Sequence, residues 1–235
     1  GIVLLPDLSR RLKARDYAGA RDAYSRAGEI ALALTLPCAI ALIVIAVPLV
    51  SVLFERGAFD GDDTAATALA VAIYGAGLPA FVLQKILQPV YFAREDTKRP
   101  FHYAVVAMIV NAVVAVGLAF VIGWIAAAIA ASLAAWVMVG LLVRGTRGYG
   151  EVAQFDDRFR KRIWRIALAS LLMGGVVWAA ALTLSPYLAL PGWRWLALLG
   201  VIGIGVLSYA VAGRALGAFR LSDITFAMRR TTSRD

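Results

Sequence analysis

The sequence predicts an all-α membrane protein, a polytopic bundle of six transmembrane helices preceded by the end of another helix. Three observations support this fold class. The 235 residues are 61% hydrophobic and 17% charged, whereas soluble domains are about 45–50% apolar and roughly 25% charged. Uncharged stretches recur that are long enough to cross a bilayer as helices. Basic residues gather in every second connection between these stretches, a pattern typical of membrane proteins.

The first 29 residues precede the first complete span. Residues 1–6 are apolar up to Pro6 and have neither a starting methionine nor a charged leader, so we interpret them as the end of a truncated transmembrane helix. Residues 7–29 are polar, with apolar side chains near helical spacing. We interpret them as a cytoplasmic amphipathic segment near the lipid headgroups, or equally as a plain extension of the next transmembrane helix.

Five uncharged stretches define the six spans, because a bilayer core about 30 Å thick requires roughly 20 apolar helical residues. The longest stretch would measure about 65 Å as a single helix, so it must fold back on itself. Gly123 and Trp124 mark the best position for that turn, since glycine permits tight turns and tryptophan favours the membrane interface. The stretches comprise residues 30–54, 64–84, 101–143, 166–193 and 195–213.

The spans fall into two groups separated by a polar segment. Residues 30–145 are predicted to form a four-helix unit, in which Pro37 and Pro48 favour bends in the first helix. Residues 146–165 are charged and are interpreted as a cytoplasmic linker. Residues 166–213 are expected to form a terminal transmembrane hairpin, followed by a basic cytoplasmic tail that ends the chain at residues 214–235.

The basic residues orient the spans. Among the 24 Lys and Arg residues, Arg56 and Arg194 alone fall in connections on the opposite face, and Lys85 lies within a span. The positive-inside rule assigns the side that carries the others to the cytoplasm, so both ends of the six-span unit are expected there. The net charge of +9 does not indicate a nucleic acid partner, because the basic residues are dispersed and attraction to membrane lipids accounts for them better.

No catalytic constellation is recognisable in the sequence, and no enzyme activity, cofactor or metal site is expected. The single histidine, His102, has no Cys or acidic neighbours at ligand spacing. The acidic pairs at 62–63 and 156–157 lie in connections and are interpreted as helix caps or solvated charge. The lone Cys38 lies in an apolar span and is interpreted as a small buried residue.

Two polar residues inside spans are candidates for a transport site. Lys85 is a cation in an otherwise apolar segment, which is costly and therefore a functional-site hypothesis by default. Its long stem could instead extend towards the cytoplasmic interface. Asn111 lies in the middle of a span, where it could line a polar cavity or hydrogen-bond a neighbouring helix.

Short strings in the chain resemble, in order and spacing, motifs of the MurJ/MviN family of lipid II flippases. The resemblance covers residues 1–145, whereas residues 146–235 match only in layout, as the extra helix pair that ends these proteins. The matching strings are LLPDLSR at 4–10, LP at 36–37, LFERGAF at 53–59, YGAGLPA at 74–80, Lys85, Pro89, YFAREDTKRP at 91–100 and SLAAW at 132–136.

This resemblance implies a fold of the multidrug/oligosaccharidyl-lipid/polysaccharide exporter superfamily, with two six-helix lobes and two extra helices, of which this chain is the C-terminal half. It implies that the protein flips lipid II, an undecaprenyl-linked muropeptide, across the bacterial inner membrane by alternating access. The headgroup would pass through a central cationic cavity. The lipid tail would lie in a groove bordered by the last two helices, here residues 166–184 and 195–213.

The resemblance also implies roles for particular residues. Lys85 and Arg56 stand at family-motif positions and are candidate substrate-binding residues, and Asn111 is the third candidate. Some relatives are thought to hold sodium with acidic residues that include one on the helix of Asn111; since that helix carries no acid here, a sodium site of that kind is not expected. Expected partners are lipid II, membrane lipids and proteins of cell-wall synthesis.

Other functions remain open at the level of sequence. Within the same superfamily, the nearest alternative is a flippase for polysaccharide-linked lipids or a drug exporter. From a different class, a membrane enzyme acting on polyprenyl-linked sugars would need acids or histidines near one membrane face, and the dispersed acids and single histidine disfavour it. A scaffold for cell-wall synthesis without transport activity is a further alternative.

Overall fold

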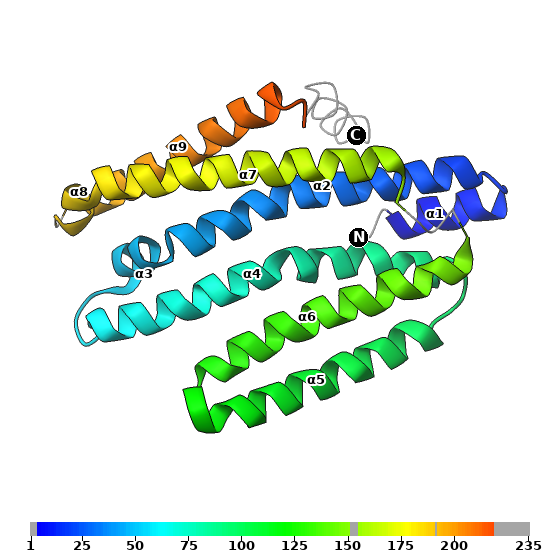
Figure 1. Ribbon diagram of the computed structural model, residues 1–235, viewed down its shortest axis with the longest axis horizontal. Helices are drawn as coiled ribbons and strands as arrows, with labels where there is room; N and C mark the ends of the chain where they lie inside the picture. The colour runs from blue at the N-terminus through cyan, green and yellow to red at the C-terminus, as the bar shows by residue number, and fades with distance from the viewer. Residues whose placement is uncertain (1–3, 151–154, 191, 219–235) are drawn as a thin grey trace, which may run out of the picture.

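The computed structural model describes residues 4–150, 155–190 and 192–218 as an elongated bundle of long helices (Figure 1). Most of the predicted tail at 214–235, the first residues of the predicted segment 1–6 and part of the predicted linker 146–165 lie outside the described residues. The elements are α1 (Leu4–Lys13), α2 (Tyr17–Val44), α3 (Ala46–Phe54), α4 (Gly61–Phe92), α5 (Lys98–Ile122), α6 (Ile125–Thr146), the 3-10 turn η1 (Arg147–Tyr149), α7 (Asp157–Thr183), α8 (Ser185–Ala189) and α9 (Arg194–Ala215).

Six of the helices in the described part of the chain are long and apolar enough to cross a bilayer, which confirms the predicted fold class. They are α2, α4, α5, α6, α7 and α9. The turn within the longest uncharged stretch lies where the sequence predicts it, between α5 and α6. Gly123 ends α5 with a φ of 64°, a left-handed conformation that glycine adopts without steric cost.

The chain turns sharply before its first long helix. Arg15 has a φ of 57° between α1 and α2, and the carboxylate of Asp16 caps α2 by accepting a hydrogen bond from the backbone N–H of Gly19 at 2.9 Å. From Tyr17 the helix runs without interruption into the first span. Residues 17–29 therefore extend that span, while residues 7–13 belong to the separate helix α1.

The first span is broken near its C-terminal end. A proline ring clashes with the carbonyl of the residue four positions earlier, which for Pro48 is Val44, and α2 ends at that residue. Ile45 joins α2 to α3 with φ −110° and ψ 24°. Pro37 is accommodated inside α2. Cys38 is exposed on the surface of α2, so the interpretation of this residue as buried is wrong.

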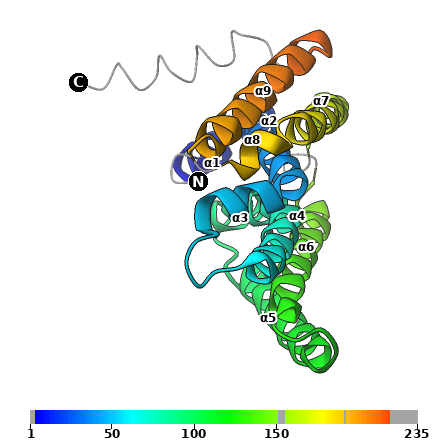
Figure 2. The same cartoon turned by 90° about the vertical axis from the view of Figure 1, so that its left-hand side faces the viewer.

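The long helices lie side by side in a row, in the order α9, α7, α2, α4, α6 and α5 (Figures 1 and 2). The core of the four-helix part lies between α2, α4 and α6 at one end, around the buried side chains of Tyr24, Leu87, Tyr91 and Leu142. Helix α5 packs mainly against α6 and leaves apolar side chains such as Phe120 exposed. An arrangement of this kind leaves two broad apolar faces along the row.

The terminal hairpin packs against the first span rather than standing apart. Met173 and Val177 of α7 and Leu198 and Val201 of α9 form a second core with Ile45 and its neighbours. Helix α7 begins at Asp157, within the stretch 146–165 that the sequence predicts as a linker, because the carboxylate of Asp156 caps it by accepting a hydrogen bond from the N–H of Phe159 at 2.7 Å. The hairpin therefore extends beyond its predicted start as a continuous helix.

Candidate functional site

An apolar groove runs between α7 and α9, the two long helices of the terminal hairpin. Its volume is about 420 Å³. The α9 residues that line it recur at helical spacing of three and four, so one stripe of that helix forms a wall. The lining residues are Leu172, Met173 and Val176 of α7 and Ile204, Leu207, Ser208, Val211 and Ala212 of α9.

The groove is apolar because its single hydroxyl is occupied within its own helix. The Ser208 hydroxyl donates a hydrogen bond to the Gly205 carbonyl at 2.9 Å. Gly205 also lets α9 approach α7 closely, since a Cβ at this position would lie 2.9 Å from a methyl group of Val177. Leu207 and Val211 are 68% and 69% exposed. A hydrocarbon chain fits such an open apolar groove better than a polar ligand does, because the lining residues offer no free hydrogen-bonding group to a polar ligand.

Lys85 lies on a face of α4 that no described helix covers. Tyr74, Phe81 and Phe92 are 46%, 36% and 40% exposed and fall on the same stripe as the exposed Lys85, since positions seven, eleven and eighteen apart share one helix face. No carboxylate of the described residues forms an ion pair with its ammonium group. The neighbouring Gln84 instead points into the bundle and donates to the Ala135 carbonyl at 3.0 Å.

The three predicted site residues do not come together in the structure. Arg56 lies in the connection between α3 and α4, donates to the Leu53 carbonyl at 3.1 Å and stacks over the ring of Trp195 at 5.4 Å. Lys85 follows the start of α4 by 24 residues, which corresponds to about 36 Å along the axis. Asn111 is half-buried in α5, whose packing is mainly against α6. Arg56 thus links the connection between α3 and α4 to the hairpin.

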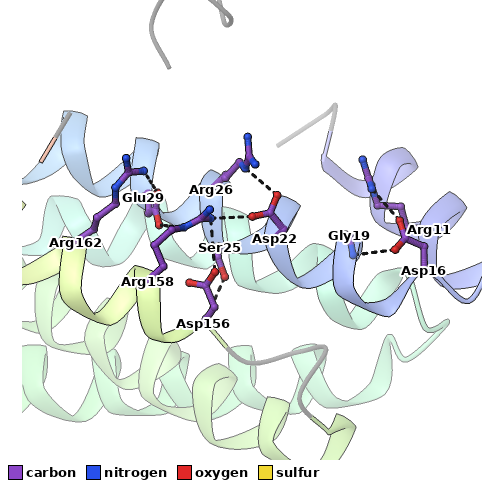
Figure 3. A network of polar contacts seen from close by, with 10 residues as sticks. All are labelled: Arg11, Asp16, Gly19, Asp22, Ser25, Arg26, Glu29, Asp156, Arg158 and Arg162. Carbon is purple, nitrogen blue, oxygen red and sulfur yellow. Dashed lines mark hydrogen bonds and ion pairs between the residues drawn. The ribbon is translucent and has the colours of Figure 1, made fainter. Parts of the chain in front are cut away.

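Two polar clusters that sequence reasoning missed close the opposite end of the bundle. In the first, the carboxylate of Glu29 lies between the guanidinium groups of Arg158 and Arg162 (Figure 3). The partners are separated by about 130 positions in the chain, so no local pattern could reveal their pairing. The available signal was weak: Asp22, Arg26 and Glu29 share one face at the start of α2.

The second cluster surrounds Tyr149 of η1 and is formed largely by residues of the matched string at 91–100. The Tyr149 hydroxyl donates a hydrogen bond to the carboxylate of Asp96, while the guanidinium groups of Arg94 and Arg99 lie 4.7 and 5.1 Å from the centre of its ring. This hydrogen bond, with another from the backbone N–H of Arg99, lowers the pKa of Asp96 below its ordinary value. The Tyr91 hydroxyl donates to the Leu142 carbonyl at 2.5 Å. The string therefore ties together the ends of α4, α5 and α6.

Known proteins similar to this chain are named as lipid II flippases. Residues 1–194 match the family model described as lipid II flippase MurJ. A probable lipid II flippase MurJ of Rhizobium tropici is 36% identical over 230 residues, which are 98% of this chain and 43% of the relative. Another, of Vibrio cholerae, is 33% identical over 232 residues, which are 96% of this chain and 43% of the relative. The chain thus spans less than half the length of these relatives.

A solved structure gives the same result for the fold. The structure of a lipid II flippase MurJ in an inward closed conformation matches with a TM-score of 0.73 at 24% sequence identity, over 90% of this chain and 41% of that chain. This likeness confirms the helical arrangement predicted from the sequence.

Proposed function

Because the chain belongs to the MurJ family of lipid II flippases, we propose that it forms the C-terminal part of a protein that flips lipid II across the bacterial inner membrane by alternating access. In this proposal lipid II is the substrate and membrane lipids cover the apolar outer surfaces. Proteins of cell-wall synthesis are the partners that consume the flipped product.

The apolar groove between α7 and α9 is the structural observation that carries the proposal. A lipid-linked precursor has a long hydrocarbon tail that must remain in an apolar environment while its polar headgroup crosses the membrane. The groove offers such an environment on the side of the bundle, lined by α7 and α9 over about 420 Å³. We assign the polyprenyl tail to this groove, with Leu172 and Val211 on opposite walls.

The headgroup requires a different surface, and the open stripe of α4 supplies one. Lys85 lies there among exposed aromatic side chains, and an ammonium group away from bulk water pairs strongly with the anionic groups of a substrate. The relatives are more than twice as long as this chain. Their additional part would complete a cavity over this stripe, with Lys85 on its wall.

Filling the groove tests the assignment of the tail. In a complete flippase that contains this chain, Ala212→Trp places an indole in the groove. Ala210→Trp is the matched control, because Ala210 is exposed on the same helix and does not line the groove. In cells depleted of their own flippase, we expect Ala212→Trp to lower outward-exposed lipid II several-fold and Ala210→Trp to leave it unchanged.

Both variants must reach the membrane in equal amounts, as measured by immunoblot. Wild-type exposure of lipid II with Ala212→Trp would contradict the groove as the tail site. If depletion of the unaltered protein left outward-exposed lipid II unchanged, lipid II would not be the substrate, and a polysaccharide-linked lipid would become the next substrate to assay.

A further inference from the structure

The contact between α2 and α7 centres on a buried acid. Glu29 is 5% exposed and is the single buried charged residue among the described residues. Its carboxylate accepts hydrogen bonds from Nε of Arg158 at 3.2 Å and from Nη1 of Arg162 at 2.6 Å (Figure 3). We name these three residues the Glu29 clamp. A buried carboxylate is stable only while such partners remain in place.

The arginines of the clamp are themselves held in position. Arg158 also pairs with Asp22 at 2.9 Å and with Asp156 at 3.6 Å. The negative charges of these acids stabilise the positive charge of its guanidinium group. Asp156 caps α7 and donates its backbone N–H to the Ser25 hydroxyl at 3.2 Å. Arg158 and Arg162 lie one turn apart on α7, so sliding α7 by one turn along α2 would leave Glu29 with one arginine instead of two and would separate Asp156 from Ser25. The clamp therefore favours the observed register between the two helices.

Aromatic packing surrounds the clamp on the side facing the core. Gly28 allows Phe155 and Phe159 to lie against the backbone of α2, since a Cβ there would be 2.9 and 2.8 Å from their rings. Phe155 stacks between Phe159 at 3.9 Å and Tyr24 at 4.4 Å. The clamp is therefore shielded from water on this side, which strengthens its ion pairs.

The same interface continues along the whole hairpin. The Tyr209 hydroxyl of α9 donates to the Ala33 carbonyl of α2 at 2.6 Å. Gly174 lets α7 approach Ile40 closely, and Arg56 stacks over Trp195 at the far end. The hairpin thus contacts the first span at both ends and in the middle.

We infer that Glu29 is a positioning residue, which holds α7 and the groove in register with α2 through a clamp that stays closed throughout the working cycle. The groove residue Leu172 follows Arg162 by ten positions on one continuous helix, about 15 Å away. Fixing Arg162 against Glu29 therefore fixes the height of the groove relative to the bundle. The inference implies that the hairpin and the first span move as one body. It rests on the proposed function for its activity readout.

Replacing the ion pair by a covalent link tests the inference. In a complete flippase with Cys38→Ala, the pair Glu29→Cys and Arg162→Cys removes the clamp, and a short bifunctional thiol reagent restores the connection. We expect at least tenfold less outward-exposed lipid II with free thiols, and recovery to at least half of the Cys38→Ala level on cross-linking. A reductant should reverse the recovery if the linker is a disulfide type.

Each result has a definite reading. Full activity with free thiols would show that the clamp is not needed, and inactivity of the cross-linked protein would show that it must open; either overturns the inference. Arg160→Ala is the control on the same turn of α7, because Arg160 is exposed and has no ion pair in the part of the chain that the structure describes. It should retain wild-type activity.

A charge exchange covers the case in which the cysteine pair does not accumulate in the membrane. Glu29→Arg alone should abolish lipid II exposure, and Glu29→Arg with Arg162→Glu should restore a measurable part of it; no restoration would overturn the inference. Failure of the proposed function is distinguishable, since the unaltered protein would then not export lipid II in the same cells.

Discussion

At the scale of single residues, a functional role can be predicted from sequence when the unfavourable environment of the side chain is visible in its sequence neighbours. Lys85 is identifiable from sequence because a cation among apolar neighbours is costly wherever the helix packs. Glu29 was not singled out, because its importance depends on Arg158 and Arg162, which follow it by about 130 positions. The motif predicts Arg56 as a site residue, and that role stays a prediction. The structure places its guanidinium over the ring of Trp195 of the hairpin, a contact that a motif alone could not reveal.

Lys85 is expected to contribute to transport through its charge. Lys85→Ala in a complete flippase should reduce outward-exposed lipid II several-fold, because the open stripe of α4 would lose the cation that pairs with the anionic groups of the substrate. Lys85→Arg keeps the charge and should retain most of the activity. Membrane levels of both variants should equal the wild type, since the side chain is exposed. Wild-type complementation by Lys85→Ala would remove Lys85 from the site.

Gly174 and Gly175 provide a matched pair for packing. A Cβ at Gly174 would lie 2.5 Å from a methyl group of Ile40, whereas Gly175 has open space. Overpacking costs about 1–3 kcal/mol and replacing a helical glycine by alanine gains about 0.5–1 kcal/mol. Gly174→Ala should therefore lower the thermal midpoint in detergent, and Gly175→Ala should raise it. Equal shifts would show that Ile40 moves aside freely.

At the scale of elements, the sequence locates the apolar centres of the helices better than their polar ends. The turn at Gly123 was predictable because the uncharged stretch 101–143 would measure about 65 Å as one helix, about twice the thickness of the hydrocarbon core. The extension of α7 to Asp157 was not predicted, because the polar composition of residues 157–165 is equally typical of a linker. The Asp156 cap, together with the packing of Phe159 and Arg162 against α2, shows why this segment is helical.

The start of α4 is stabilised by a capping box that can be tested directly. The Asp60 carboxylate accepts hydrogen bonds from the N–H groups of Asp62 at 2.9 Å and Asp63 at 3.1 Å. Asp60→Ala should lower the free energy of unfolding by about 1 kcal/mol, measured as a lower thermal midpoint in detergent. Asp60→Asn retains an acceptor and should stay near the wild type. An unchanged midpoint for Asp60→Ala would mean that water replaces the cap.

At the scale of the whole molecule, charge distribution and hydrophobic length together predict six helices and the order in which they cross. They do not predict the row from α9 to α5, in which α7 lies beside α2 and α6 beside α4 (Figure 2). Neighbours in that row are decided by small residues and long-range hydrogen bonds. The Ser132 hydroxyl donates to the Ile73 carbonyl and the Trp136 indole to the Ala76 carbonyl, and neither pairing has a signature within one segment.

The orientation of the whole chain is open to a labelling experiment. With Cys38→Ala as background, single cysteines at Ala58 and Thr97 flank α4, whose 32 residues extend over about 48 Å. An impermeant maleimide should label Ala58→Cys in intact cells, and Thr97→Cys only after permeabilisation, because basic connections stay in the cytoplasm. Labelling of both positions from the same side would contradict the six-span layout.

The short turn at Gly123 and Trp124 has a consequence for how the chain is inserted during synthesis. This turn carries no charge, whereas the connection before α4 carries Glu55, Arg56 and Asp60, and the first turn of α4 adds Asp62 and Asp63. Moving an uncharged turn through the bilayer requires little dehydration of polar groups. In the orientation that the positive-inside rule predicts, we therefore expect α5 and α6 to insert as a pair more readily than α3 and α4, whose connection carries charges that must cross the bilayer.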